Sequence, residues 1–440
     1  MPRLVRLAIA IGLVALLSAG FAIAFRATLG LAARALGGDS SIVSVIADAP
    51  MWLRVALPAA GGLLAGVVVV ALARVRRTGA GGVGNVMEAI VLGRVRVSIV
   101  RSAMQALASW LAIAGGNSLG REGPLIQAGA AIGEAAREVL HIDDDDARLV
   151  LAAGVAAGFA SAYNAPIAAC LFVCEVVTGV LALEAMVPIL LASVIATVAV
   201  RLSLGDAPLY GLRAFAFRPS ELVAYVGLAV IAAPIGVAFL RGLGLVERLW
   251  ASVPLPLRPA LGGAVCGGIL CALPLVAGNG FEPLSLLLDG KLAIGAVAWL
   301  LVAKPLATAA AVGSGNPGGV FTPTLLVGGL AGTLYALGLH AVFGDAISQP
   351  GAYALVGLAA ALAATTHAPM TAAILACELS GDYALALPLL ATCALSAALA
   401  RRLYIDSVYT AELTKRGLRW RLTLDGRRVV ENQSQTVDVP

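Results

Sequence analysis

Long runs of apolar residues recur along this chain of 440 residues and limit the folds that it can adopt. A helix needs about 20 mostly apolar residues to cross the hydrocarbon core of a bilayer. Only 12% of the residues are charged, against about 25% in soluble domains. The pattern predicts an all-α polytopic membrane protein. The clearest apolar runs lie at 7–25, 55–73, 149–174, 222–240, 292–312 and 383–400, and other runs, broken by Gly or Pro, lie at 111–135 and 311–338.

The first apolar run, which follows Arg3 and Arg6, has two interpretations. A cleaved signal peptide carries an apolar stretch of about 7–15 residues. This run is longer, and further apolar runs follow it along the chain. We therefore expect a first membrane helix rather than a signal peptide.

Basic residues gather beside the apolar runs and give the chain a net charge of +5. Positive flanks of membrane helices are usually cytoplasmic. We therefore expect both termini in the cytoplasm and no nucleic-acid partner. The clusters are Arg3 and Arg6, then Arg74, Arg76 and Arg77, and near the end Arg401, Arg402, Lys415, Arg416, Arg419 and Arg421.

Two sequence blocks occur twice, in the same order. NAPIAACLFVCE at 164–175 matches HAPMTAAILACE at 367–378, and GREGPLIQAG at 120–129 matches GVFTPTLLVG at 319–328. The repeat predicts two homologous halves, 1–205 and 206–440, joined by a polar link at 205–221 within one integrated transmembrane domain. Transporters built from two such halves place their sites where interrupted helices meet.

The Gly-x-x-x-Pro pattern at the start of the second pair of blocks suggests helix beginnings. Gly allows close approach of a ligand to the backbone, and Pro suits the first helical turn. Free N–H groups at a helix start carry partial positive charge. Two such starts facing each other would bind an anion; alternatively, they mark breaks between packed helices.

Taken together, these motifs resemble the CLC family of chloride channels and proton-coupled chloride transporters. The resemblance also includes DSVYTAEL at 406–413 and is nearest to the short bacterial ClC-type, voltage-gated channels without C-terminal regulatory domains. It implies two inverted repeats of tilted and broken helices, a homodimer, and passage of chloride or other monovalent anions across the bacterial inner membrane.

The resemblance also implies residue roles. Glu122 matches the gating glutamate, and Gly120 precedes it in the same motif. Val320 and Phe321 match residues whose backbone N–H groups face the anion, and Tyr409 matches a tyrosine whose hydroxyl lines the inner end. Independently of the family, a carboxylate within a membrane segment is a candidate functional group because it is costly there.

Two positions depart from the family pattern. In GVGNV at 82–86, Val83 replaces a serine that coordinates the anion, and a valine side chain has no hydrogen-bond donor. Backbone N–H groups or the Asn85 amide could replace it. In LFVCEVV, Val176 follows Glu175 where proton-coupled members carry a second glutamate.

These departures favour passive or weakly proton-coupled anion movement, with an H+/Cl− antiporter as the alternative. Glu175 and Glu184 are the candidates for a proton path.

A third interpretation belongs to another class. GNSLG at 116–120 fits the Gly-x-Ser-x-Gly elbow of serine hydrolases, which would make Ser118 a nucleophile. The sequence shows no strand–helix alternation to support such an elbow. Three histidines and six cysteines form no metal-binding pattern, and we expect neither an enzyme nor a cofactor.

Overall fold

The computed structural model describes residues 2–75, 82–93, 96–255, 257–422, 428–432 and 435–438. Arg76 and Arg77 of the second basic cluster lie outside these residues. The described part up to residue 205 forms α1 (Arg3–Ala35), α2 (Ile42–Asp48), α3 (Met51–Val75), α4 (Val83–Leu92), α5 (Ile99–Ala114), α6 (Glu122–Leu140), α7 (Asp144–Tyr163), α8 (Pro166–Phe172), the π-helical turn η1 (Val173–Thr178) and α9 (Leu183–Leu204).

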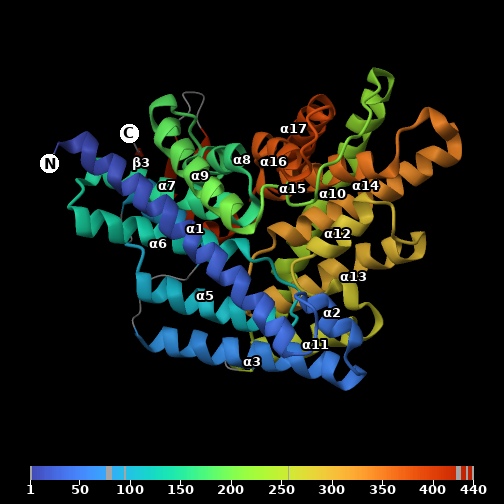
Figure 1. Ribbon diagram of the computed structural model, residues 1–440, viewed down its shortest axis with the longest axis horizontal. Helices are drawn as coiled ribbons and strands as arrows, with labels where there is room; N and C mark the ends of the chain where they lie inside the picture. The colour runs from blue at the N-terminus through green and yellow to red at the C-terminus, as the bar shows by residue number, and fades with distance from the viewer. Residues whose placement is uncertain are drawn as a thin grey trace.

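The remaining described residues are also mostly helical (Figure 1). They form the 3-10 turn η2 (Pro219–Glu221), α10 (Leu222–Trp250), α11 (Arg258–Ala272), η3 (Pro274–Val276), α12 (Phe281–Leu288), α13 (Ile294–Gly313), α14 (Phe321–Phe343), η4 (Gly344–Ala346), α15 (Pro350–Thr366), α16 (Pro369–Ser380), α17 (Ala386–Leu403), α18 (Thr410–Lys415), β1 (Leu418–Leu422), β2 (Arg428–Asn432) and β3 (Gln435–Asp438).

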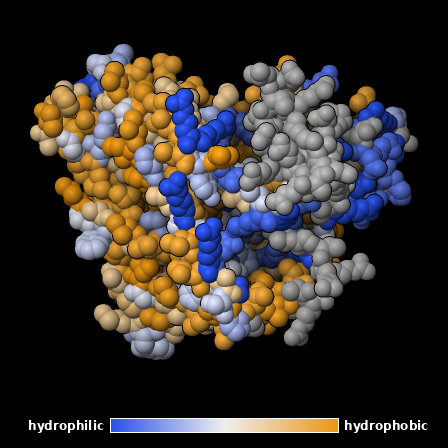
Figure 2. All heavy atoms as spheres, turned by 180° about the vertical axis from the view of Figure 1, so that it is seen from behind, coloured by the Kyte–Doolittle hydropathy of each residue, from blue (hydrophilic) through white to orange (hydrophobic). Residues whose placement is uncertain are grey.

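The expected all-α membrane fold is confirmed. Within the described residues, seven helices are long and apolar enough to cross a membrane: α1, α3, α9, α10, α13, α14 and α17. On the face in Figure 2, hydrophobic side chains cover much of the surface and hydrophilic ones gather toward one side. The sequence did not predict the small antiparallel sheet β1-β2-β3 after α18, in which Trp420 pairs with Val430.

The apolar run at 149–174 forms two helices instead of one. α7 ends at Tyr163, and Asn164 then adopts a left-handed conformation with φ 57°. Pro166 begins α8, because its fixed φ and missing N–H suit the first helical turn. The matching block behaves in the same way: His367 has φ 59° between α15 and α16, and Pro369 begins α16.

The glutamate that closes each repeated block binds the start of the helix in the other block. Ile167 N and Ala168 N, at the start of α8, donate to the Glu378 carboxylate over 3.0 and 2.8 Å. Reciprocally, Met370 N and Thr371 N, at the start of α16, donate to Glu175 over 3.1 and 2.7 Å. Each glutamate therefore satisfies N–H groups that the first turn of a helix leaves without partners.

Two helix pairs cross at glycines. α6 packs on α7 and α14 packs on α15. A Cβ atom on Gly154 would overlap the carbonyl oxygen of Gly129, and one on Gly357 would overlap that of Gly328. Such contacts suit a membrane protein, in which small residues let helix backbones approach closely.

Gly154→Ala and Gly357→Ala should each destabilise the protein, because the added methyl group meets backbone that cannot move aside. Overpacking of this kind costs about 1–3 kcal/mol. Thermal unfolding of purified protein in detergent measures the effect. Gly20→Ala in α1 is the control, since no atom lies within 4 Å of its added Cβ. Equal melting temperatures for all three variants would contradict the prediction.

Glu175→Gln and Glu378→Gln should lower the free energy of unfolding, because the amide cannot accept at both positions. Loss of hydrogen bonds to a charged group costs about 1–3 kcal/mol. Denaturant or thermal unfolding in detergent tests this, with the exposed Glu138→Gln as control. A stability loss no larger than that of the control would show that the exchanged contacts contribute little.

Candidate anion site

The beginnings of α6 and α14 meet at a short antiparallel bridge. Gly120 N donates to Gly319 O over 2.7 Å, and Gly319 N donates to Gly120 O over 2.8 Å. α6 begins two residues after Gly120, and α14 begins two residues after Gly319. The structure thus brings together the two Gly-x-x-x-Pro blocks that the sequence paired. The positive ends of the two helices converge on the same place.

The carboxylate of Glu122 occupies that place. Its side chain is buried, with 2% of the residue exposed. Phe321 N donates to Oε1 over 2.9 Å, and Thr322 Oγ1 donates to Oε2 over 3.2 Å. A Cβ atom on Gly120 or Gly319 would overlap this carboxylate. Glycine at both bridge positions therefore leaves the space that the carboxylate fills.

Of the two positions predicted to offer backbone N–H groups in α14, Phe321 donates to the carboxylate. Val320 is the residue before the helix, and its carbonyl oxygen accepts from Thr324 N over 3.0 Å and from Thr324 Oγ1 over 2.8 Å. Val320 thus helps to close the first turn of α14.

Sequence reasoning did not identify two hydroxyl groups at the site. Thr322 contacts Glu122 directly, and Tyr163 OH lies 2.9 Å from Thr322 Oγ1. Thr322 directly follows the predicted Phe321, so its hydroxyl was a signal in the sequence. Tyr163 is 159 residues away along the chain. Only the packing of α7 against α14's first turn reveals its role.

Tyr409 joins the site through aromatic rings. Its ring lies 5.7 Å from that of Phe172, edge to face, and Phe172 lies 6.3 Å from Phe321. Tyr163 and Phe159 contact Phe321 as well, at 5.3 and 5.4 Å. The predicted inner tyrosine is therefore connected by one cluster of rings to the residue that donates to Glu122.

Val83 begins α4 and is buried in the same core as Tyr409 and Phe321. Gly82 precedes it with φ 110°, and Gly82 N donates to Gln127 Oε1 over 3.1 Å. Asn85 Oδ1 accepts from Arg416, so this part of the amide is already engaged. The start of α4 consequently has no side-chain hydroxyl at the position where the family pattern has a serine.

Arg121 lies just before α6. Its guanidinium charge is close enough to interact with Glu122, with the hydroxyl groups of Tyr163 and Tyr210, and with Arg26 of α1. The Arg121 charge beside the buried carboxylate raises the positive potential near the helix starts, which favours anions there.

The two candidate proton-path residues lie in different settings. Glu175 binds the start of α16, and its Oε2 also accepts from Thr371 Oγ1 over 2.6 Å. Glu184 lies exposed in the first turn of α9. Val176 is buried directly after Glu175.

Ser118 has the surroundings of a structural residue. Its Oγ lies 2.9 Å from Thr308 Oγ1, and both residues are completely buried. Among the described residues, no histidine is hydrogen-bonded to it. Nor do three or more His, Cys, Asp or Glu side chains gather as a metal site in the described part of the chain.

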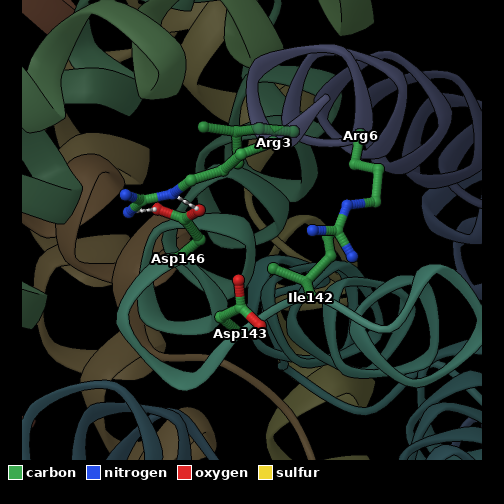
Figure 3. A pocket seen from close by; sticks show the side chains of 6 residues that line it. Arg3, Arg6, Ile142, Asp143 and Asp146 are labelled. Carbon is green, nitrogen blue, oxygen red and sulfur yellow. Dashed lines mark hydrogen bonds and ion pairs between the residues drawn. The ribbon is translucent and has the colours of Figure 1, made fainter. Parts of the chain in front are cut away.

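A shallow pocket lies elsewhere, between the start of α1 and the start of α7 (Figure 3). Arg3 Nε and Nη2 donate to Asp146 Oδ2 and Oδ1 over 2.7 and 2.8 Å. The pair ties the first membrane helix to α7. None of the predicted anion-site residues lines this pocket.

Sequence comparisons support the same family as the motifs. The family of voltage gated chloride channels matches residues 61–401. A ClcB-like protein of Ralstonia nicotianae is 38% identical over 390 residues, covering 86% of this chain and 90% of the relative. A voltage-gated ClC-type chloride channel of Escherichia coli K12 is 33% identical over 379 residues, covering 85% of this chain and 90% of the relative.

Solved structures share the fold. A slow cyanobacterial Cl−/H+ antiporter superposes with a TM-score of 0.81 at 24% identity, covering 94% of this chain and 98% of the other. A eukaryotic CLC transporter gives 0.78 at 21% identity, covering 94% and 74%. With its helical membrane fold and its matches to short bacterial relatives, the chain belongs to the CLC family of chloride channels and transporters.

Proposed function

We propose that this protein moves chloride and similar monovalent anions across the membrane, passively or with weak proton coupling, along a path gated by Glu122. The observation that carries the proposal is the position of the Glu122 carboxylate. It accepts from Phe321 N and Thr322 Oγ1 at the start of α14. A small anion without its hydration shell can use the same donors.

The gate follows from competition for these donors. While Glu122 is ionised and in place, its tethered carboxylate excludes a free anion. Protonation removes the charge and weakens the bond to the helix start, and a permeant anion then takes the place. We therefore expect anion movement to increase as the pH falls.

The surroundings of Glu175 support weak rather than strict proton coupling. Both of its carboxylate oxygens accept hydrogen bonds from α16, and its neighbour Val176 cannot carry a proton. Glu184 is the remaining candidate for a proton path from the cytoplasm. Strict H+/Cl− exchange is the alternative, and joint recording of chloride and pH in liposomes separates the two.

We also propose the arrangement that the sequence analysis predicted: two inverted homologous halves, 1–205 and 206–440, in a homodimer in the bacterial inner membrane with both termini cytoplasmic. The reciprocal caps of α8 and α16 and the matching glycine crossings support the two halves. The beginning of α1 and β3 lie at the same end of the molecule in Figure 1, which supports termini on one side.

Glu122→Gln should remove most of the pH dependence of chloride efflux, because the amide cannot ionise. Liposomes containing purified protein are loaded with chloride, and chloride and pH are recorded together from about pH 4.5 to about pH 7.5, which spans ordinary and raised carboxyl pKa values. Glu138→Gln, at the other end of α6, is the control. Unchanged flux and pH response in Glu122→Gln would refute the gate.

The same recording decides the coupling. Passive movement predicts chloride efflux without matching proton uptake in the wild-type protein. Proton uptake driven by the chloride gradient would establish the antiporter instead. If the wild-type protein moved no more chloride than empty liposomes do and had a hydrolytic activity that Ser118→Ala abolished, the transport proposal would fail as a whole.

Val83→Ser should change the order of anion preference, because it adds a hydroxyl donor at the start of α4. One added neutral hydrogen bond is worth about 0.5–1.5 kcal/mol, which corresponds to roughly a twofold to tenfold gain in chloride affinity. Competition of nitrate, bromide and fluoride with chloride flux measures it. Val83→Thr restores the hydroxyl at nearly the same volume as valine. A preference order unchanged in both variants would show that this position does not contact the anion.

A further inference from the structure

A second carboxylate, that of Glu412, lies against the start of α4. We call this region, near Tyr409, the Tyr409 end of the site. Glu412 is in α18, three residues after Tyr409, and it faces the beginning of α4. The N–H of Gly84 donates to its carboxylate. A Cβ atom on Gly84 would lie 2.8 Å from Glu412 Oε2, and one on Gly82 would lie 3.2 Å from the same oxygen. Glycine on both sides of Val83 thus leaves space for this carboxylate.

Arg416, the residue directly after α18, holds Glu412 in place. Its Nη2 donates to Glu412 Oε1 over 2.7 Å, and its Nη1 contacts Asn85 and, at 3.3 Å, Glu88. The side chain of Glu412 is 33% exposed, whereas those of Arg416 and Glu88 are 20% and 18% exposed. Glu412 can therefore leave α4 toward solvent and remain paired with Arg416.

The contacts of Glu412 at the start of α4 differ from those of the two glutamates that cap α8 and α16. Glu175 and Glu378 each accept from two backbone N–H groups of the helix that they cap. Glu412 accepts from the backbone of Gly84 and shares its charge with the Arg416 guanidinium.

The position of Glu412 matters because of Val83. The valine side chain offers no donor, so an anion at this end depends on backbone N–H groups at the start of α4. Glu412 occupies the N–H of Gly84. An anion that binds here must displace it.

We propose that Glu412 is a second tethered carboxylate, which competes with the permeant anion at the start of α4 and so sets the anion affinity of the Tyr409 end. The inference rests on the proposed anion-transport function. The charged groups around Glu412 are Lys415 on its own helix, Arg416 directly after that helix and Glu88 on α4. Lys415 is paired with Glu247.

The pH dependence has a definite sign. Burial raises the pKa of the Glu412 carboxyl above its ordinary value, and Arg416 and the Gly84 N–H act against this. Because the pKa is raised, falling pH neutralises Glu412 before an ordinary exposed glutamate. Anion affinity at the start of α4 should therefore increase as the pH falls, independently of Glu122.

Isothermal titration of chloride into purified protein tests this in a Glu122→Gln background, in which the first carboxylate no longer titrates. Glu412→Gln should raise the chloride affinity about fivefold to tenfold at neutral pH. It should also abolish the pH dependence that remains in Glu122→Gln. Glu88→Gln is the matched control: it removes the same charge beside Arg416, but Glu88 lies in the second turn of α4.

Glu412→Asp distinguishes direct competition for the start of α4 from a purely electrostatic effect of the negative charge. It keeps the charge and a partner for Arg416, but the shorter side chain withdraws its oxygen from Gly84. Competition predicts higher chloride affinity in this variant too, whereas a purely electrostatic effect predicts none. This variant also keeps the test valid if Glu412→Gln proves unstable.

Two results would overturn the inference: equal affinities in the Glu412 variants and Glu88→Gln, or residual pH dependence in the double variant Glu122→Gln/Glu412→Gln. If Glu122→Gln still alters flux as predicted, only the role of Glu412 fails. If no variant and no wild-type sample binds or moves chloride, the proposed function itself fails.

Discussion

Helices that begin inside a bilayer leave backbone N–H groups without partners, and no water is present to satisfy them. This constraint organises the centre of the protein. α8 and α16 begin against carboxylates from each other's block, while α14 and α4 begin against Glu122 and Glu412. The fold is thus built around helix starts that need a negative charge.

The positions and hydrogen-bond partners of the carboxylates distinguish those that stabilise helix starts from the one that we propose as a gate. Glu175 and Glu378 hold two adjacent N–H groups each and lock two helix starts together. Glu122 lies where two helix starts converge, between glycines that leave it space. When a carboxylate leaves such a position, a mobile anion can bind to the helix starts in its place. The proposed gate would therefore use the same kind of contact that stabilises the starts of α8 and α16.

Much of this was accessible from the sequence because it is local or repeated. Apolar run length predicted the membrane fold, and the paired blocks predicted which helix starts correspond. Glu122 was identifiable as a carboxylate in an apolar segment. Tyr163 was not, because its contact with Thr322 depends on packing between residues 159 positions apart. The break of the run at 149–174 was also missed, although Asn164 and Pro166 marked it.

The sequence by itself determined the membrane class, the repeat and the candidate residues, since hydrophobic run length and motif spacing are properties of the chain alone. Only the tertiary structure decided which carboxylate meets which helix start. It placed the Glu122 carboxylate against the first residues of α14, and it placed the Glu412 carboxylate against the start of α4, more than 300 positions before it in the chain. The reason is physical: a helix start presents donors in a fixed direction, and only packing determines which side chain lies in front of it.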